Sequence, residues 1–225
     1  MATGYYVKKL SGERLRRCYA IAPPRVVRYL EAEIRHLESL VETGDRVLEL
    51  GCGYGRVAFA LAGRAGHVVG VDTAGESLRL ARDLDESNGR CAFLRMDAAR
   101  LGFRDAVFDV VACVQNGVCA FGLDPRILIR QALRVLRPGG RLVLSSYAPG
   151  FWSQRLDWFE RQAREGLVGE IDRDASGDGV IVCRDGFRAA ALDGEGFMRL
   201  GEDLELVPEI TEVDGSSVFC TFMKP

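Results

Sequence analysis

The segment from Val47 to Val57 constrains the fold more than any other part of the sequence. It reads VLELGCGYGRV, an apolar run followed by glycines at positions 51, 53 and 55. Glycine permits a tight turn between a strand and a helix, and it lets a ligand approach the backbone without a Cβ in the way. The helix that follows would present unpaired N–H groups at its N-terminus. The segment therefore predicts a strand, a ligand-binding loop and a helix in succession.

Short apolar runs alternate with helical patterns around this segment. Strands that alternate with helices are joined by parallel crossovers, so the pattern predicts a doubly wound α/β sheet. The last two runs, 204–210 and 217–222, are expected as an antiparallel pair at one edge of the parallel sheet. The other predicted strands are 46–50, 67–71, 91–95, 108–113 and 141–146, and the predicted helices are 24–41, 56–62, 75–85 and 124–136.

The pattern changes beyond Tyr147. A further helix is predicted near 152–163, and two β-like runs follow at 180–183 and 187–192. Asp185-Gly186 lies between these runs, and Asp-Gly is a favoured hairpin pair because both positions accept a positive φ. This part of the chain is therefore expected to be an insertion that carries a β-hairpin.

The amino-acid composition limits the classes of binding partner that are expected. The formal net charge is -2, and the two signs are nearly balanced among the 28% of residues that are charged. A polyanion-binding surface is therefore not expected, which disfavours nucleic acid and favours a small-molecule substrate. The sequence shows neither a run of about 20 apolar residues nor a secretory signal, so no membrane partner is expected. A monomer and a homodimer both stay open.

The cysteines and histidines argue against cross-links and metal. Seven cysteines are an odd number and are widely scattered, several of them inside apolar runs. This usage is typical of the reducing cytoplasm. The two histidines and the cysteines form no pair with metal-ligand spacing, so no metal site is expected.

Polar side chains are predicted to meet at the carboxyl edge of the sheet. Asp72 ends the second predicted strand, Asp97 follows the third, and Gln115 follows the fourth, while Glu49 belongs to the first. Ligands of open α/β sheets bind beyond this edge, where the strand order switches. The Asp72 carboxylate can accept hydrogen bonds from both hydroxyls of a ribose. The alternative for Asp72 is a helix N-cap.

This ordered set resembles the motifs of the class I S-adenosylmethionine-dependent methyltransferase family. Glu49-x-Gly51-x-Gly53-x-Gly55 is similar to the first motif of the family, and Asp72 to its ribose-binding acid. Asp97 matches the residue that contacts the adenine amino group, and Leu-Arg-Pro-Gly-Gly at 136–140 matches the late motif. The resemblance covers about 43–146 and implies S-adenosylmethionine as the cofactor. It implies these contact residues: Glu49, Gly51, Cys52, Gly53, Gly55, Asp72, Thr73, Asp97, Ala98 and Gln115.

The resemblance also implies the fold. The family has a Rossmann-like, seven-stranded, mostly parallel sheet in the order 3-2-1-4-5-7-6, with helices on both faces and strand 7 antiparallel. We expect a single methyltransferase domain over 1–225. The N-terminal segment around Tyr5–Tyr19 and the insertion are expected to roof the acceptor pocket. The expected parts are an N-terminal helical cap (1–42), a cofactor-binding core (43–146), an insertion or lid (147–200) and closing strands (201–225).

The residues that meet the acceptor are less defined. Val114-Gln115-Asn116-Gly117 stands where many amino methyltransferases of nucleic acid or protein carry Asp/Asn-Pro-Pro-Tyr, so those substrates are disfavoured. Gln115, Asn116, Tyr6 and Tyr19 are the candidates for catalytic contacts, with a turn-closing or packing role as the alternative for each. Oxygen, nitrogen, sulfur and carbon all stay open as the methylated atom.

Two arginines are possible ligands for a substrate carboxylate. Arg25 and Arg155 have the required charge, but solvated positions are the expectation for both.

Three other functions are alternatives to methyl transfer. A nicotinamide-dependent oxidoreductase would carry Gly-x-Gly-x-x-Gly, but Arg56 occupies the third glycine position. An aminopropyl transferase would use the decarboxylated cofactor, and it usually carries extra acidic residues near strand four, where Gln115 and Asn116 stand. A catalytically silent S-adenosylmethionine-binding partner or sensor is compatible with all the motifs. The prediction is a methyltransferase that acts on a small molecule.

Overall fold

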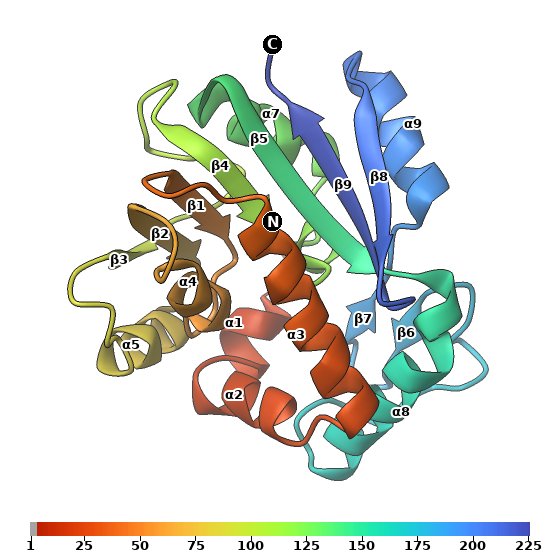
Figure 1. The fold of residues 1–225 in the computed structure, drawn as a ribbon. Helices are drawn as coiled ribbons and strands as arrows, with labels where there is room; N and C mark the ends of the chain where they lie inside the picture. The colour runs from red at the N-terminus through yellow and green to blue at the C-terminus, as the bar shows by residue number, and fades with distance from the viewer. Residues whose placement is uncertain (1–3) are drawn as a thin grey trace.

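The computed structural model describes residues 4–225, and its centre is a seven-stranded sheet (Figure 1). The strand order is β3-β2-β1-β4-β5-β9-β8. β1 to β5 pair in parallel, and β9 is antiparallel to β5 and β8. This confirms the predicted order, with β9 as strand 7 and β8 as strand 6. The strands are β1 (Arg46–Leu50), β2 (His67–Asp72), β3 (Cys91–Arg95), β4 (Phe108–Cys113), β5 (Leu136–Tyr147), β6 (Ile181–Val182), β7 (Arg188–Ala189), β8 (Pro208–Val213) and β9 (Ser217–Met223).

Helices cover both faces of this sheet, as predicted (Figure 1). α3, α4 and α5 pack on one face, and α7 and α9 pack on the other. The helices are α1 (Tyr5–Lys9), α2 (Glu13–Ala20), α3 (Pro24–Ser39), α4 (Arg56–Leu61), α5 (Gly75–Asp83), α6 (Gly117–Ala120), α7 (Pro125–Val135), the 3₁₀-helix η1 (Pro149–Phe151), α8 (Trp152–Arg164) and α9 (Gly194–Leu204).

The central strands are apolar on both sides because helices cover both sides. In β1, Val47 joins the buried cluster under α4 and α5, whereas Leu48 joins the cluster under α7. β4 repeats this with Val110 and Val111. Successive side chains of a strand point to opposite faces. The continuous apolar runs of the sequence are therefore what a sheet covered on both faces requires.

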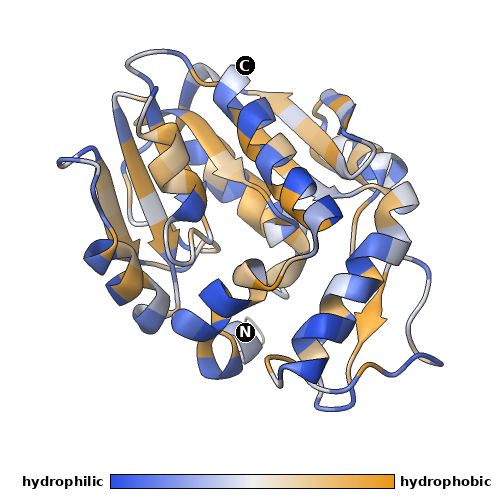
Figure 2. Ribbon diagram, turned by 60° about the horizontal axis from the view of Figure 1, so that its bottom comes forward, coloured by the Kyte–Doolittle hydropathy of each residue, from blue (hydrophilic) through white to orange (hydrophobic). Residues whose placement is uncertain are grey.

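The N-terminal helices and the insertion lie together beyond the carboxyl ends of the parallel strands (Figure 1). Figure 2 brings this side forward and shows hydrophilic and hydrophobic residues interspersed along these helices. Leu10 and Cys18 of the N-terminal segment share one buried cluster with Phe159 of α8 and with Ile181 and Phe187 of the hairpin region. Segments distant in sequence are thus joined into one apolar unit over the edge of the sheet.

One helix in the C-terminal third differs from the prediction. α9 is not indicated by the sequence pattern, because glycines at 194, 196 and 201 weaken the helical signal. Its start carries a recognisable cap, since Asp193 Oδ1 accepts a hydrogen bond from the Gly196 N–H at 2.8 Å. Because α9 extends to Leu204, β8 begins at Pro208 and not at the predicted residue 204.

The two Asp-Gly turns also differ from each other. The predicted hairpin is present as β6 and β7, but of its two turn residues only Gly186 has a positive φ, 92°. In the turn between β8 and β9, Asp214 and Gly215 both have a positive φ, of 56° and 62°. The turn that joins β8 to β9 therefore has the left-handed pair of a type I′ hairpin.

Candidate active site

A cavity at the carboxyl edge of the sheet has the glycine loop as one wall. Gly51, Gly53 and Gly55 have φ values of 75°, 53° and 89°. The N–H groups of Gly51 and Cys52 donate to Val71 O at 2.8 and 3.1 Å, which holds the loop against β2. A Cβ at position 51 would lie 2.7 Å from the ring of Phe121. Glycine is therefore required by conformation and by close approach, and bare backbone faces the cavity.

The Asp72 carboxylate stands at the end of β2 beside this loop. Its Oδ2 accepts a hydrogen bond from Gly53 N–H at 2.9 Å, and its Oδ1 accepts one from Ala74 N–H at 2.8 Å. Burial raises the pKa of Asp72, and these backbone hydrogen bonds oppose the rise. Each oxygen retains lone-pair capacity for a ligand. The N-cap of α5 is Ala74, so the alternative of Asp72 as the N-cap is wrong.

The cavity continues along the sheet edge to the end of β3. Thr73, Asp97 and Ala98 line this part. Asp97 is exposed, and its Oδ1 accepts a hydrogen bond from Ala99 N–H at 2.9 Å, which fixes the carboxylate. Because the strand order is β3-β2-β1, the polar groups of these three strands follow one another along the edge.

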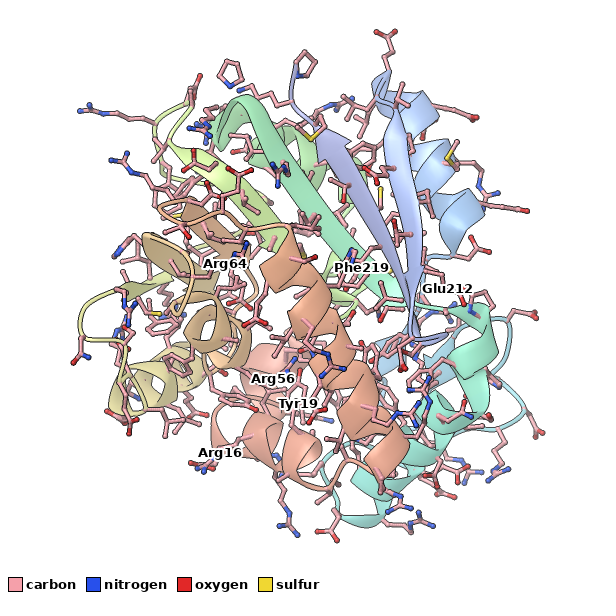
Figure 3. The ribbon with its side chains drawn as sticks, viewed as in Figure 1. Arg16, Tyr19, Arg56, Arg64, Glu212 and Phe219 are labelled. Carbon is pink, nitrogen blue, oxygen red and sulfur yellow. The ribbon has the colours of Figure 1, made fainter. Side chains whose placement is uncertain are left out.

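Glu49 and Arg56 carry opposite charges in the next part of the wall. The guanidinium of Arg56 lies over the ring of Tyr19, with its carbon 5.2 Å from the ring centroid (Figure 3). Within the described residues, Arg56 Nε and Nη2 and Glu49 Oε2 are buried atoms without a hydrogen-bond partner. Burial raises the pKa of Glu49 to about 7, and the positive charge of Arg56 opposes the rise.

The facing wall comes from the N-terminal segment, β5 and α8. Trp158 Nε1 donates to Cys18 O at 2.9 Å, which ties α8 to α2. Both of the elements that the sequence predicts as a roof therefore contribute to this wall. Its lining residues are Tyr6, Leu10, Leu15, Tyr19, Tyr29, Tyr147, Trp158, Phe159 and Gln162.

The two amide side chains that follow β4, Gln115 and Asn116, have different surroundings. Gln115 lines the cavity, where its Oε1 accepts a hydrogen bond from Tyr19 Oη at 3.0 Å. Asn116 is buried, and its Nδ2 donates to Ala190 O at 2.7 Å while its Oδ1 accepts from Ser146 Oγ at 2.9 Å. Asn116 therefore attaches the insertion to β5 and does not line the cavity.

Burial also raises the pKa of one further predicted cofactor contact, Cys52, and of two catalytic candidates, Tyr6 and Tyr19. Cys52 lines the cavity, and desolvation raises the pKa of its thiol. Desolvation likewise raises the pKa of Tyr6 and of Tyr19, so both phenols stay protonated near neutral pH. The phenols can act as hydrogen-bond donors, and neither is suited to be a general base.

A buried carboxylate behind this wall was missed by the sequence prediction. Glu33 of α3 is 1% exposed, and its Oε1 accepts a hydrogen bond from Ser145 Oγ at 2.6 Å. Burial raises its pKa to about 7, against the opposing effects of Ser145 and Arg56. The available signal was its spacing, since Glu33 lies three and four residues after Leu30 and Tyr29 and so falls on the apolar face of the helix.

Glu33→Gln is expected to alter stability in a pH-dependent way. The carboxyl of Glu33 ionises near 4.5 when unfolded and near 7 when buried. Between these values the native state retains a proton that the unfolded state has released, so this group lowers stability as pH rises. Glutamine does not ionise. Urea unfolding should show the free energy of unfolding of the variant, relative to the unaltered protein, rising by about 1–3 kcal/mol from pH 4.5 to pH 8.

Glu31→Gln is the matched control for this measurement. Glu31 lies on the same helix with its side chain 58% exposed, and it pairs with Arg35. Its difference from the unaltered protein should be the same at both pH values. A pH-independent difference for Glu33→Gln would contradict the raised pKa.

The fold and the row of polar groups along its edge define a class of protein, namely an α/β protein that binds a nucleoside-containing ligand. Comparisons with known proteins show which family the central part of the chain is similar to. Residues 48–144 match the family model described as a methyltransferase domain. The demethylmenaquinone methyltransferase of Clavibacter sepedonicus is 36% identical over 109 residues, 47% of this chain and 42% of that protein. The 27-O-demethylrifamycin SV methyltransferase of Amycolatopsis mediterranei is 36% identical over 111 residues, 48% of this chain and 40% of that protein.

A solved structure extends the likeness of fold to nearly the whole chain. The N-methyltransferase NodS of Bradyrhizobium japonicum, in complex with S-adenosyl-L-homocysteine, superposes with a TM-score of 0.60. It is 17% identical, and the match covers 95% of this chain and 97% of that one. The curated relatives match over less than half of their own length. The match to the methyltransferase-domain family covers residues 48–144, and the likeness to the solved structure is a likeness of fold.

The cavity residues fit the cofactor of this family. The wall formed by the glycine loop is bare backbone, and a Cβ at these positions would take up space beside it. Asp72 offers acceptors at the strand end next to the loop, and buried donors and acceptors without partners remain at Arg56 and Glu49. An adenosine that carries a charged amino-acid group has the polar groups to match them.

Two expectations about arginines are wrong. Arg155 is 1% exposed, and its guanidinium donates to Gly179 O, Ala189 O and, at a longer distance, Ala190 O. Arg25 pairs with Asp214 at 2.7 Å with its side chain 29% exposed. Neither arginine occupies a freely solvated position, because each holds together segments that are distant in sequence.

Within 4–225, no group of three or more His, Cys, Asp or Glu side chains is placed to hold a metal ion. No helix in the same range has the length and apolar character needed to cross a membrane.

Proposed function

We propose that this protein transfers a methyl group from S-adenosylmethionine to a small-molecule acceptor. The observation that carries the proposal is a single cavity with two unlike parts. One part consists of the glycine loop and the acids of the sheet edge, and the other is lined by tyrosines, Trp158 and Phe159. The first part suits an adenosine, and the second suits an apolar or aromatic acceptor.

The cofactor contacts follow the order of the strands. We assign the adenine amino group to Asp97, with a backbone contact from Ala98, and the ribose hydroxyls to Asp72. Glu49, Gly51, Cys52, Gly53, Gly55, Thr73 and Gln115 complete the proposed contact set. All of these residues line the cavity except Gly55, which is the N-cap residue of α4.

Methyl transfer requires mainly that the acceptor and the methyl group be aligned. When bound, S-adenosylmethionine supplies a methyl group on a sulfonium that departs as a neutral thioether in an in-line displacement. Holding acceptor and methyl group in line and excluding water can supply roughly 7–11 kcal/mol of barrier reduction. Tyr6, Tyr19 and Gln115 would orient the acceptor through hydrogen bonds, because burial keeps the two phenols protonated.

Two further observations support this function. The relatives reported above are named for demethylmenaquinone and for 27-O-demethylrifamycin SV, which are small molecules. All seven cysteines are free thiols, which supports our proposal that the protein works in the cytoplasm.

Transfer of label tests the function. The protein is incubated with methyl-labelled S-adenosylmethionine and a panel of small aromatic and apolar acceptors, and labelled products are identified by mass. Asp72→Ala should weaken cofactor binding by about 1.5–3 kcal/mol, the usual contribution of hydrogen bonds to a charged group, and should reduce transfer at limiting cofactor. Circular dichroism checks that the variant is folded.

Three outcomes separate the alternatives. Transfer by the unaltered protein supports the proposal. Binding without transfer to any acceptor favours a silent partner or sensor. Unchanged binding in folded Asp72→Ala contradicts the ribose assignment.

A further inference from the structure

Arg155 of α8 is a buried positive charge that no carboxylate of residues 4–225 neutralises. Its guanidinium donates to backbone carbonyls, and its Nε is a buried atom without a hydrogen-bond partner. Burial lowers its pKa, and the groups that most oppose this are the hydroxyls of Tyr147, Tyr29 and Tyr6 and the thiol of Cys119. Arginine stays protonated in proteins, and a buried charge without a counter-charge is unfavourable. A negative group of a ligand would therefore be stabilised near Arg155.

Two phenols extend the effect of this charge into the cavity. Tyr6 of α1 and Tyr147 at the end of β5 both line the cavity, whereas Arg155 does not. Burial raises the pKa of both phenols, so they stay protonated, and the positive charge of Arg155 opposes the rise. The guanidinium carbon lies 4.3 Å from the centroid of the Tyr147 ring. A cation over an aromatic face attracts the electrons of the ring, which makes the phenol a stronger hydrogen-bond donor.

These two hydroxyls are available to a ligand, unlike that of Tyr19. The Tyr19 hydroxyl is already engaged, since it donates to Gln115 Oε1 at 3.0 Å. Tyr147 Oη interacts with the hydroxyl of Tyr29, but without hydrogen-bonding geometry, because Tyr29 Oη has no hydrogen-bond partner. No hydrogen bond is among the main influences on the pKa of Tyr6. The wall therefore presents two neutral donors that share one positive charge behind them.

The negative groups of the protein do not cancel this charge. Glu33 acts on Tyr147 with the opposite sign, but its Oε1 accepts from Ser145 Oγ and it does not line the cavity. Burial raises the pKa of Glu33 to about 7, so near neutral pH it is only partly ionised. No carboxylate is among the main influences on Tyr6. The acids of the sheet edge belong to the other part of the cavity.

We infer that the acceptor carries a carboxylate, whose two oxygens accept hydrogen bonds from Tyr6 and Tyr147 and whose charge is balanced by Arg155. This inference rests on the proposed function and deepens it, because it names the substrate class as an apolar or aromatic carboxylic acid. A carboxylate has acceptor capacity on both oxygens, and hydrogen bonds to an ionised acceptor are stronger than neutral ones. Tyr6 and Tyr147 would touch the acceptor, and Arg155 is a positioning residue that acts through them.

Titration of benzoate and benzamide, followed by NMR, tests the inference. The two probes have the same shape, but only benzoate is charged at neutral pH. Each is titrated, with S-adenosylhomocysteine present, into the full chain and into Tyr6→Phe, Tyr147→Phe and Arg155→Met. The measured quantity is the dissociation constant of benzamide divided by that of benzoate. A variant that only alters the shape of the pocket changes both constants alike, so this ratio isolates the recognition of charge.

Tyr5→Phe and Arg161→Met are the matched controls. Tyr5 precedes Tyr6 on α1, but its hydroxyl donates to Asp185 at 2.6 Å, and neither of these two residues lines the cavity. Arg161 lies on α8 like Arg155, with its side chain 45% exposed. Circular dichroism checks that every variant is folded.

The unaltered protein should bind benzoate at least about 10-fold more tightly than benzamide, because hydrogen bonds to a charged group are about twice as strong. Each phenylalanine variant should lower the ratio about 3- to 10-fold, which is the difference between a charged and a neutral hydrogen bond. Arg155→Met should lower the ratio to about 1 or less, since the balancing charge is gone. The two controls should stay within about twofold of the unaltered protein.

Several results would overturn the inference. A ratio near 1 in the unaltered protein, or no binding of benzoate at millimolar concentration, would show that the cavity has no carboxylate site. An unchanged ratio in both phenylalanine variants would show that the two hydroxyls do not hold the carboxylate. Binding of S-adenosylhomocysteine in the same samples would leave the proposed function in place. If S-adenosylhomocysteine does not bind, the proposed function fails, and the benzoate titration alone still decides whether the carboxylate site exists.

Discussion

Arg155→Ala should lower the free energy of unfolding by about 3–5 kcal/mol. The side chain is fully enclosed, and it donates to Gly179 O at 2.8 Å and to Ala189 O at 2.8 Å. Its guanidinium carbon also lies 4.3 Å from the centroid of the Tyr147 ring. Alanine would leave a cavity, and it would leave one buried and two partly buried carbonyls without this donor, which is costly. Urea unfolding of the purified protein measures the effect.

Two further variants of α8 residues serve as controls for this prediction. Arg161→Ala removes an exposed arginine that pairs with Asp157 one turn earlier, so a change within about 0.5 kcal/mol is expected. Arg155→Met keeps most of the volume, and its intermediate loss would separate the hydrogen bonds from the cavity. A loss below about 1 kcal/mol for Arg155→Ala would show that the insertion is held by other contacts.

Gly53→Val is expected to reduce S-adenosylmethionine affinity by more than about 100-fold, equivalent to about 2.7 kcal/mol. Gly53 has a φ of 53° and lines the cavity, and its N–H donates to Asp72 Oδ2. A Cβ there would lie 3.0 Å from Leu15 Cδ2, and the two methyl groups of valine would occupy space beside the loop. Calorimetry with circular dichroism as the folding check measures the loss.

A substitution at Gly89 is the control that separates backbone strain from obstruction of the cavity. Gly89 has a φ of 82° and open space around its Cβ position, and it lies in the turn before β3. Gly89→Val imposes a comparable backbone strain, of order 1–3 kcal/mol, without entering the cavity. It should bind the cofactor normally. Retained affinity in folded Gly53→Val would mean that the ligand does not approach the loop.

The core of the fold could be predicted because its signals are local. An apolar run ending in a glycine loop, and a carboxylate at the next strand end, depend on neighbours in sequence. The first four predicted strands accordingly match β1 to β4 to within one residue. α9 was missed because its glycines resemble a loop, although Asp193 supplied a capping signal.

Two buried charged side chains, Glu33 and Arg155, could not be predicted because their contacts are not local. Glu33 is buried only because β5 brings Ser145 against α3, and Arg155 only because the insertion folds back over α8. Pattern rules place an isolated charge at the surface, since charged residues are almost never fully buried unless paired. The partner that changes this expectation is more than a hundred residues away for Glu33, so no spacing rule reveals it.

The position of β9 has a consequence for synthesis of the chain. β5 is covered on its outer edge by β9, and the insertion, α9 and β8 all lie between these two strands in sequence. At about 5–20 residues per second, several seconds pass before the ribosome has made the strand that closes this edge. A nascent chain therefore holds an unpaired apolar strand next to a finished nucleoside-binding half, which is the kind of edge that recruits chaperones or a neighbouring chain.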